Sequence, residues 1–184
     1  MLFALLAVSL TLGSVISTVL SVHLLTMLQA RDVALGAAVA LGALIGPSQV
    51  GARVVEMFFG RHYHPIWTMV ASTVLVAAGM GILLSGAPVI AVALVLYGAG
   101  IGIKSIARGT LPLALYGATG YAALMGRLAM PSLVAQSLSP SLGAFLLDQF
   151  GATATLVVLT GLAIVNVASV IALWLYVRPL RSTP

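Results

Sequence analysis

The sequence predicts an all-α, polytopic membrane protein, a single domain over residues 1–184 with six transmembrane helices. Two features of the composition predict this class: 61% of the residues are hydrophobic, and only 6% are charged. A soluble domain carries charge on about a quarter of its residues, so this chain could not cover itself with a hydrated surface. The apolar stretches are long and continuous rather than alternating, which favours helices over a transmembrane barrel.

The six expected spans are close to the roughly 20 residues that a bilayer requires, and polar or turn-forming residues separate them. They cover residues 2–28, 33–58, 66–84, 89–106, 121–147 and 152–177. The first span begins without a basic residue and is longer than the apolar region of a signal peptide, so we expect it to remain as a helix.

The segments between the spans differ in length and character. Arg31 and Asp32 mark the first loop, residues 60–65 form a polar turn, and residues 85–88 form a tight turn. After the fourth span, an arginine, a proline and several glycines predict a longer linker up to residue 120. Pro131 and Pro140 are expected to interrupt the fifth span, because proline removes a helical hydrogen bond. Residues 148–151 then turn the chain into the sixth span.

The distribution of basic residues predicts the orientation. Six spans place both termini on one side, together with the second-to-third and fourth-to-fifth loops. That side collects Arg61, Lys104, Arg108, Arg178 and Arg181. The other side holds Arg31, balanced by Asp32 and Asp148. Because basic loops stay in the cytoplasm, we expect a cell-membrane protein with both termini cytoplasmic.

Small and aromatic residues predict how the spans pack. Gly42 with Gly46, and Gly98 with Gly102, have the GxxxG spacing that lets helix backbones approach closely. Four aromatic residues lie toward predicted span ends, where interfacial belts form. They are Trp67, Tyr97, Trp174 and Tyr176.

Composition and motifs exclude several functional classes. The chain has no cysteine, so disulfides and thiol chemistry are absent, and it has no Walker loop for ATP. Its basic residues are scattered singly between apolar segments, which argues against nucleic-acid binding. His62 and His64 have no nearby acid except Glu56, which makes a poor metal site. No histidine follows His64, and Ser48 lacks a protease motif, so we expect neither an enzyme nor a cofactor.

The second span contains the first candidate site residues. Gln49, Arg53 and Glu56 follow one another at helical spacing, so they share a face and Arg53 can pair with Glu56. Charged residues inside a span are costly, which makes this stripe a candidate lining of a solute pathway. The alternative is an arginine that extends to the interface and a glutamate that ends the helix.

The fifth and first spans add further polar residues. Arg127 lies either in the fifth span or at its cytoplasmic interface, whereas Gln136 is deeper and is expected to face a cavity. Ser14 and neighbouring hydroxyls form a mild polar stripe on the first span, and such hydroxyls usually bond to their own backbone. His23 is expected to be structural rather than a proton carrier.

Three pairs of segments resemble the carboxyl-terminal six-helix half of a major facilitator superfamily transporter, and the resemblance covers essentially all 184 residues. They are Gly46-Pro-Ser-Gln-Val-Gly-Ala-Arg-Val-Val-Glu56 with Gly60-Arg61-His62, Tyr97-Gly-Ala-Gly-Ile-Gly102 with Arg108-Gly-Thr-Leu-Pro112, and Pro140-Ser-Leu-Gly143 with Leu147-Asp148 and Gly151. The first pair departs from the family pattern in having Glu56 instead of aspartate, one extra residue before Gly60, and Arg61 with two histidines as its basic run.

The resemblance implies a secondary transporter of a small solute that works by alternating access. The first, second, fourth and fifth spans would face a midplane cavity, and the third and sixth would face lipid. Residues expected to meet the solute are Gln49, Arg53, Arg127 and Gln136. The arginines among them suit an anionic or polar solute. Residues expected to act in coupling or gating are Glu56, Arg61 and Arg108.

A complete transporter of this family has twelve helices, so three arrangements follow from the resemblance. The chain is a fragment, the partner of a separate amino-terminal half, or a homodimer, and we favour the first two. A different class remains open: a non-transporting membrane scaffold or accessory subunit. A scaffold would tolerate alanine at Arg53, Glu56 and Gln136, but not at Gly98 and Gly102.

Overall fold

The computed structural model describes residues 1–86 and 89–178, and every regular element in these ranges is a helix, which confirms the all-α class. In chain order the elements are α1 (Leu2–Gln29), α2 (Leu35–Ala43), α3 (Ile45–Phe59), the 3-10 helix η1 (Gly60–His62), α4 (Pro65–Ser85), α5 (Ile90–Tyr116) and α6 (Tyr121–Val177). Ala87 and Pro88 of the predicted tight turn, and Arg181 of the predicted basic side, lie outside the described residues.

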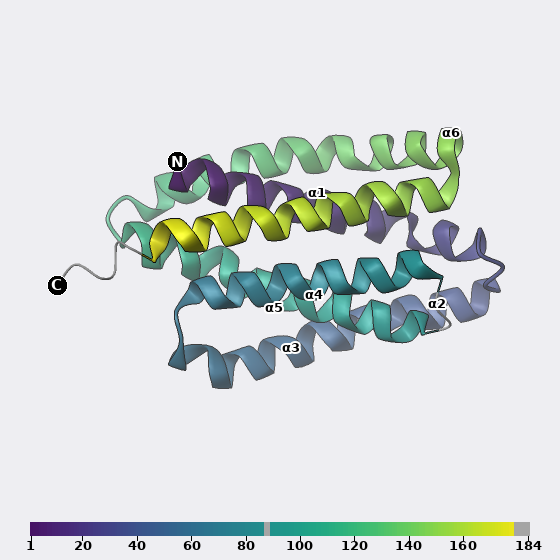
Figure 1. Cartoon of the computed structure of the whole chain (residues 1–184), viewed down its shortest axis with the longest axis horizontal. Helices are drawn as coiled ribbons and strands as arrows, with labels where there is room; N and C mark the ends of the chain where they lie inside the picture. Colours follow the sequence, from purple (N-terminus) through teal and green to yellow (C-terminus); the bar gives the residue numbers. More distant parts are fainter. Residues whose placement is uncertain (87–88, 179–184) are drawn as a thin grey trace.

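The α6 helix is continuous in the chain but reverses its direction at Gly151 (Figure 1). Gly151 has φ 80° and ψ 175°, a conformation that only glycine adopts without strain. We call residues 121–150 the first arm of α6 and residues 152–177 the second arm. The predicted turn over residues 148–151 is therefore reduced to Gly151, and Asp148 remains helical.

Five helical segments within the described ranges are long and apolar enough to cross a membrane. They are Leu2–Gln29, Leu35–His62, Pro65–Ser85, Ile90–Tyr116 and Tyr121–Val177. The first four correspond to the first four predicted spans. The fifth segment is 57 residues long, and the residues of the two remaining predicted spans fall in the two arms of α6.

Three prolines lie inside helices, where the sequence suggested breaks. The predicted linker around Pro112 is wrong, because α5 continues to Tyr116, and the predicted interruptions at Pro131 and Pro140 are wrong, because the first arm keeps helical geometry. A proline inside a helix removes one hydrogen bond. Ending the helix would instead leave up to four C=O and four N–H groups without helical partners. Leu111, next to Pro112, is fully buried, so such groups would have little access to water.

A smaller irregularity divides the second predicted span into α2 and α3 at Leu44. Pro47 has no N–H group to bond to the carbonyl of Ala43, one turn earlier. Leu44 instead closes a tighter turn, with its N–H donating to the carbonyl of Leu41 at 3.1 Å. The backbone of Leu44 stays near helical values, so α2 and α3 continue in nearly the same direction.

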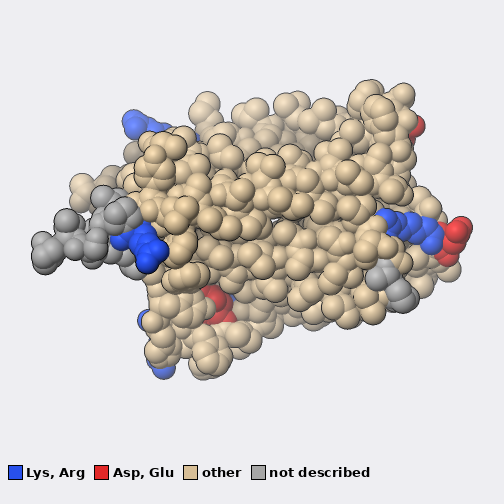
Figure 2. All heavy atoms as spheres, viewed as in Figure 1, with Lys and Arg blue, Asp and Glu red and all other residues tan. Residues whose placement is uncertain are grey.

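The helices run along the long axis of one bundle (Figure 1). The amino terminus, η1 and the end of α6 lie at one end, which we call the terminal end, and the reversal of α6 lies at the other, the Gly151 end. α1 packs chiefly on α6, α4 on α5 and α6, and α3 on α5. On the face shown in Figure 2, charged side chains gather toward the two ends and leave the middle uncharged.

Glycines set the closest helix contacts. A β-carbon at Gly98 would lie 2.9 Å from the carbonyl oxygen of Ile45, and one at Gly102 would lie 2.8 Å from the Cα atom of Gln49. This GxxxG pair therefore brings α5 against α3, as predicted. The same prediction is wrong for Gly42 and Gly46, because no neighbouring atom lies within 4 Å of a β-carbon at Gly46.

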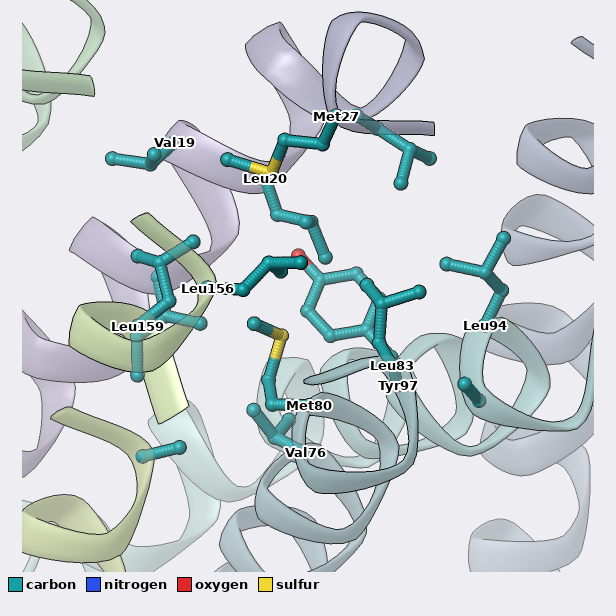
Figure 3. Close-up of a cluster of buried hydrophobic side chains, with 14 of the residues drawn as sticks. Val19, Leu20, Met27, Val76, Met80, Leu83, Leu94, Tyr97, Leu156 and Leu159 are labelled. Atoms are coloured by element: carbon teal, nitrogen blue, oxygen red, sulfur yellow. The ribbon is translucent and has the colours of Figure 1, made fainter. Parts of the chain in front are cut away.

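Two apolar clusters fill the bundle. A cluster at the Gly151 end includes Leu20, Met80 and Leu156 (Figure 3), and a second cluster at the terminal end includes Leu6, Met69 and Leu173. Four helical segments carry a polar residue between their contributions to the two clusters. We call these residues the polar layer: Ser14, Ser72, Lys104 and Asn166.

Tyr97 corrects one sequence prediction. It was expected in an aromatic belt at a span end, but it is only 2% exposed and lies inside the cluster at the Gly151 end (Figure 3). Its hydroxyl reaches the carbonyl of Ser17 at 3.5 Å, and an internal acceptor of this kind permits burial of a tyrosine. Trp67 and Trp174 do lie at helix ends, where their rings are 5.5 Å apart.

The glycine contacts predict opposite effects for two Gly→Ala substitutions. We expect Gly102→Ala to lower the free energy of unfolding by about 1–3 kcal/mol, because the added methyl meets the backbone of Gln49. Gly46→Ala is the matched control: it enters open space and should be neutral or stabilising by up to about 1 kcal/mol. Thermal unfolding of the purified protein in detergent measures both, and equal destabilisation would contradict the assigned α3–α5 contact.

Candidate functional site

A pocket of about 360 Å³ opens among α1, α3, α5 and the first arm of α6. Its lining residues are Ser14, Ser17, Arg53, Ile101, Lys104, Ser105, Arg108 and Gln136. The four contributing segments correspond to the first, second, fourth and fifth predicted spans. α4 and the second arm of α6 supply none of these lining residues.

The pocket lies about halfway along the bundle. Lys104 is 14 residues after the start of α5 at Ile90 and 12 residues before its end at Tyr116. Gln136 is similarly central in the first arm, 15 residues after Tyr121. At 1.5 Å per helical residue, both side chains start about 18 Å or more from either end of their helix. Lys104 and Gln136 are therefore remote from both ends of the bundle, whereas Arg53 and Arg108 lie nearer the terminal end, six and eight residues before the ends of α3 and α5.

Three cationic side chains line the pocket, and no acidic residue is among the described lining residues, so we call it the basic pocket. Arg108 follows Lys104 by one helical turn, a spacing at which like charges destabilise a helix by about 0.2–0.5 kcal/mol. Arg53 adds a third positive charge from α3. The bundle thus gathers like charges where separation would be more favourable.

The protein groups that contact these cations are neutral and distant. The Nε atom of Arg53 donates to the carbonyl of Gly102 at 3.4 Å, and the ammonium of Lys104 donates to the hydroxyl of Ser14 at 3.5 Å. Both distances exceed the usual range of a strong charge-assisted hydrogen bond. Most of the donor capacity of the three cations therefore remains available to a ligand.

Gly13 determines where the Lys104 side chain lies. A β-carbon at Gly13 would lie 2.8 Å from the ammonium nitrogen of Lys104 and 3.4 Å from the side-chain nitrogen of Asn166. Asn166 accepts a 2.7 Å hydrogen bond from the hydroxyl of Ser9. The absence of a side chain on Gly13 therefore lets a lysine from α5 and an asparagine from the second arm approach α1 at the same level.

The predicted solute-contacting residues fall into two groups. Arg53 and Gln136 line the pocket, and so does Arg108, which was assigned to gating. Gln49 is outside the lining, since its backbone packs against Gly102. Arg127 is exposed and also outside the lining, nine residues before Gln136 toward the start of the first arm.

Sequence reasoning missed Lys104 as a pocket residue and treated it only as a marker of orientation. The fourth span was expected to end at residue 106, which would place Lys104 at an interface. α5 extends to Tyr116, so Lys104 lies at its middle. The signal that could have identified it is that Gly109 and Pro112, the residues expected to end the helix, do not end it, so that Lys104 lies within a long helix. Ser14 and Ser17 bond to their own backbone as expected, at 2.8 and 2.9 Å, and also line the pocket.

Glu56 lies in a separate site, and the predicted pairing with Arg53 is wrong. Glu56 is only 6% exposed, and its two carboxylate oxygens accept hydrogen bonds from the hydroxyls of Tyr63 at 2.7 Å and Thr68 at 2.6 Å. Gly60 leaves space for this carboxylate, because a β-carbon there would lie 3.0 Å from the carboxyl carbon. We call Glu56, Tyr63 and Thr68 the Glu56 clamp, and it ties α3 to α4.

Arg61 and the histidines have local positions. Arg61 and Glu56 both line a small hollow of about 230 Å³ at the terminal end, apart from the basic pocket. His62 contacts the carbonyl of Phe59 at 3.2 Å, and His64 caps α4 by accepting from the N–H of Ile66 at 3.1 Å. These contacts give both histidines a role in the turn between α3 and α4.

His23 joins α1 to the first arm of α6. Its Nε2 atom lies 3.0 Å from the carbonyl of Pro140. Gly143 makes room for the ring, because a β-carbon there would lie 2.7 Å from the Cδ2 atom of His23. This packing agrees with a structural role for His23.

Comparison with known proteins assigns no chemistry to the basic pocket. No protein-family model, curated protein or solved structure matches this chain. The lining combines three cations, several hydroxyls and one amide within walls of otherwise apolar helices. Hydroxyl, amide and cationic groups that converge in one hollow are the groups with which proteins bind small polar molecules.

The Glu56 clamp predicts a contribution to stability that depends on pH. Desolvation of the phenol, its hydrogen bond to Glu56 and the negative charge of Glu56 raise the pKa of Tyr63 from 10.0 to about 12. A pKa raised by folding stabilises fully below the unfolded value, and this contribution is lost as pH rises through the folded value. We expect Tyr63→Phe to cost about 1 kcal/mol from pH 7 to pH 9, and the difference from wild type to shrink between pH 10 and pH 12.

Unfolding of both proteins in detergent across this pH range checks the prediction. Thr68→Val is the control, because threonine does not titrate there and its loss should leave a deficit that does not follow the Tyr63 transition. A Tyr63→Phe deficit that stays constant to pH 12, or that is absent at pH 7, would contradict the clamp.

Proposed function

We propose that this chain is a membrane-embedded bundle with six spans and that it forms part of a secondary transporter for a small solute. The observation that carries the proposal is the basic pocket halfway along a bundle of apolar helices. The six spans are α1, the segment Leu35–His62, α4, α5 and the two arms of α6.

The exposed surface supports a lipid environment. Large apolar side chains are exposed along α3 and along the first arm of α6, which is unusual for a soluble monomer. On α3 they are Val50, Val54, Val55, Met57, Phe58 and Phe59, and on the first arm they include Leu133, Leu138, Leu142, Phe145 and Phe150. Together with the uncharged middle of Figure 2, these side chains form a surface suited to hydrocarbon or to another apolar bundle.

The charged residues support one orientation in the membrane. Arg61 and Arg178 lie at the elements of the terminal end, whereas Arg31, Asp32 and Asp148 flank the Gly151 end. Arg31 is also engaged by the protein, since its guanidinium donates to the carbonyls of Leu83 and Leu84 at the end of α4. The terminal end therefore carries the excess of free positive charge, which favours a cytoplasmic location for both termini.

The depth and origin of the pocket support transport. Ionisable residues within spans are costly and commonly mark solute pathways. The pocket draws its residues from the four spans that the major facilitator resemblance assigns to a cavity, while α4 and the second arm of α6 lie behind them. Alternating access works by rocking two bundles about a midplane site, so the proposal includes a second six-helix bundle as partner.

A scaffold remains the second candidate, and the tight α3–α5 contact at Gly98 and Gly102 is the observation that favours it. Close helix packing of this kind is what a scaffold requires. A scaffold has no use for a cluster of unpaired cations in a pocket midway along the bundle, and so we prefer a transporter.

The proposed topology predicts which residues are accessible from each side. Because the chain has no cysteine, a single introduced thiol is the only one present. We expect Arg61→Cys and Asp32→Cys to react with a membrane-impermeant maleimide from opposite sides of sealed vesicles. Labelling of both from the same side would contradict the six-span arrangement.

Alternating access predicts that the pocket opens to both sides in turn. We expect Ser105→Cys, in the pocket, to be labelled in right-side-out and in inside-out vesicles. Ser72→Cys is the matched control, because Ser72 is only 1% exposed and should be labelled from neither side. Two results together would favour the scaffold: labelling of Ser105→Cys from one side alone, and uptake of the small solute that Arg53→Ala leaves unchanged.

A further inference from the structure

The three cations of the basic pocket converge from two helices that glycine holds close together. Arg53 comes from α3, and Lys104 and Arg108 come from successive turns of α5. Gly102, two residues before Lys104, makes the close contact with α3, and its carbonyl accepts from Arg53. The packing contact between α3 and α5 thus also sets the position of the charges.

The protein does not neutralise this cluster from within. The chain has three acidic residues. Glu56 is committed to the hydroxyls of its clamp, and Asp32 and Asp148 lie at the Gly151 end. Arg53 is exposed and Lys104 and Arg108 are half-buried, so the three cations share one open pocket among apolar helices without a counter-charge from the protein. Like charges held together in this way repel one another. A bound anion would offset that repulsion.

We propose that the pocket is an anion site in which Arg53, Lys104 and Arg108 bind the oxyanion group of a small carboxylate or phosphate. Two guanidinium groups supply paired donors that match the two oxygens of such a group, and the ammonium supplies a point charge. Ser14, Ser105 and Gln136 add neutral hydrogen-bonding groups at the wall. The inference that the transported solute is an anion rests on the proposed function. The inference that the pocket binds an anion does not.

The size and depth of the pocket favour a free anion over the headgroup of a lipid. A volume of about 360 Å³ is at the lower end of small-molecule sites, so it admits a compact solute. The phosphate of a membrane lipid lies in the interfacial region, whereas Lys104 lies at the middle of α5, about 18 Å from its nearer end. The same oxyanion chemistry is therefore assigned to a free solute rather than to a lipid headgroup.

Ligand-dependent unfolding of the full chain in phosphatidylcholine nanodiscs tests the site. The probes are potassium phosphate and potassium succinate, with potassium chloride at equal ionic strength and glucose as references. A ligand that binds the native state raises the unfolding temperature. We expect phosphate, succinate or both to raise it above chloride and glucose. No rise with either anion would overturn the proposal.

Variants identify the residues that bind the anion. Lys104→Gln and Arg53→Gln should each weaken anion affinity at least about tenfold, whereas Lys104→Arg keeps the charge and should retain binding. Gly13→Ala should also weaken it, because the methyl displaces the Lys104 ammonium without changing any charge. Arg127→Gln is the matched control, since Arg127 is an exposed arginine outside the pocket. Equal weakening by Arg127→Gln and Lys104→Gln would contradict the assigned site.

Two further experiments distinguish the possible outcomes. Phosphatidylglycerol added to the nanodiscs should leave the phosphate or succinate effect intact, and its loss would reassign the pocket to a lipid headgroup. Ser105→Cys labelling in vesicles of the native membrane, where a partner bundle is present, then separates the two proposals. Anion binding together with labelling of Ser105→Cys from one side alone would sink the transport function and leave the anion site standing. Ser105→Cys labelling from both sides without anion binding would sink the anion site alone.

Discussion

The need to satisfy polar groups inside an apolar bundle governs this structure. No buried side-chain nitrogen or oxygen among the described residues lacks a hydrogen-bond partner. Asn166 accepts from Ser9, and Ser72 donates to the carbonyl of Gly100 at 2.9 Å, so these residues of the polar layer join neighbouring segments. Helices that pass through prolines follow the same rule, because one lost backbone bond costs less than an unpaired helix end. Directional bonds of this kind fix the register of helices whose apolar contacts are not directional.

Two glycine contacts position the charged side chains of the pocket. Gly102 lets the backbone of α3 approach α5, and its carbonyl accepts from Arg53, so one residue joins the packing contact to the pocket. Gly13 on α1 leaves the space that the Lys104 ammonium occupies. A β-carbon at Gly102 would meet backbone atoms that cannot yield, whereas one at Gly13 would meet the flexible end of a side chain. The first glycine therefore controls the fold, and the second controls the position of a charge.

The pocket is positively charged because Glu56 is held apart from Arg53. Arg53 and Glu56 share a stretch of α3, and a direct pair would have cancelled their charges. The Glu56 clamp holds the carboxylate on the side of α4 with neutral hydroxyl donors, and Arg53 turns toward α5. The result is a buried acid that stabilises the α3–α4 turn and a group of cations left without a protein counter-charge.

Composition and the continuous, non-alternating apolar runs determined the all-α class, and the length of these runs determined the positions of the helices, because backbone groups in apolar surroundings have few alternatives to helix. Gly151 marked the reversal of α6, and the rarity of polar residues in apolar spans identified Arg53 and Gln136 as pocket candidates. Tertiary structure decided the partners of Glu56, the burial of Tyr97, the difference between the two GxxxG pairs, and the central depth of Lys104. Each of these depends on which helices approach one another and how far a helix continues past a proline. Spacing along one chain shows which residues share a helix face, but only packing decides what that face meets.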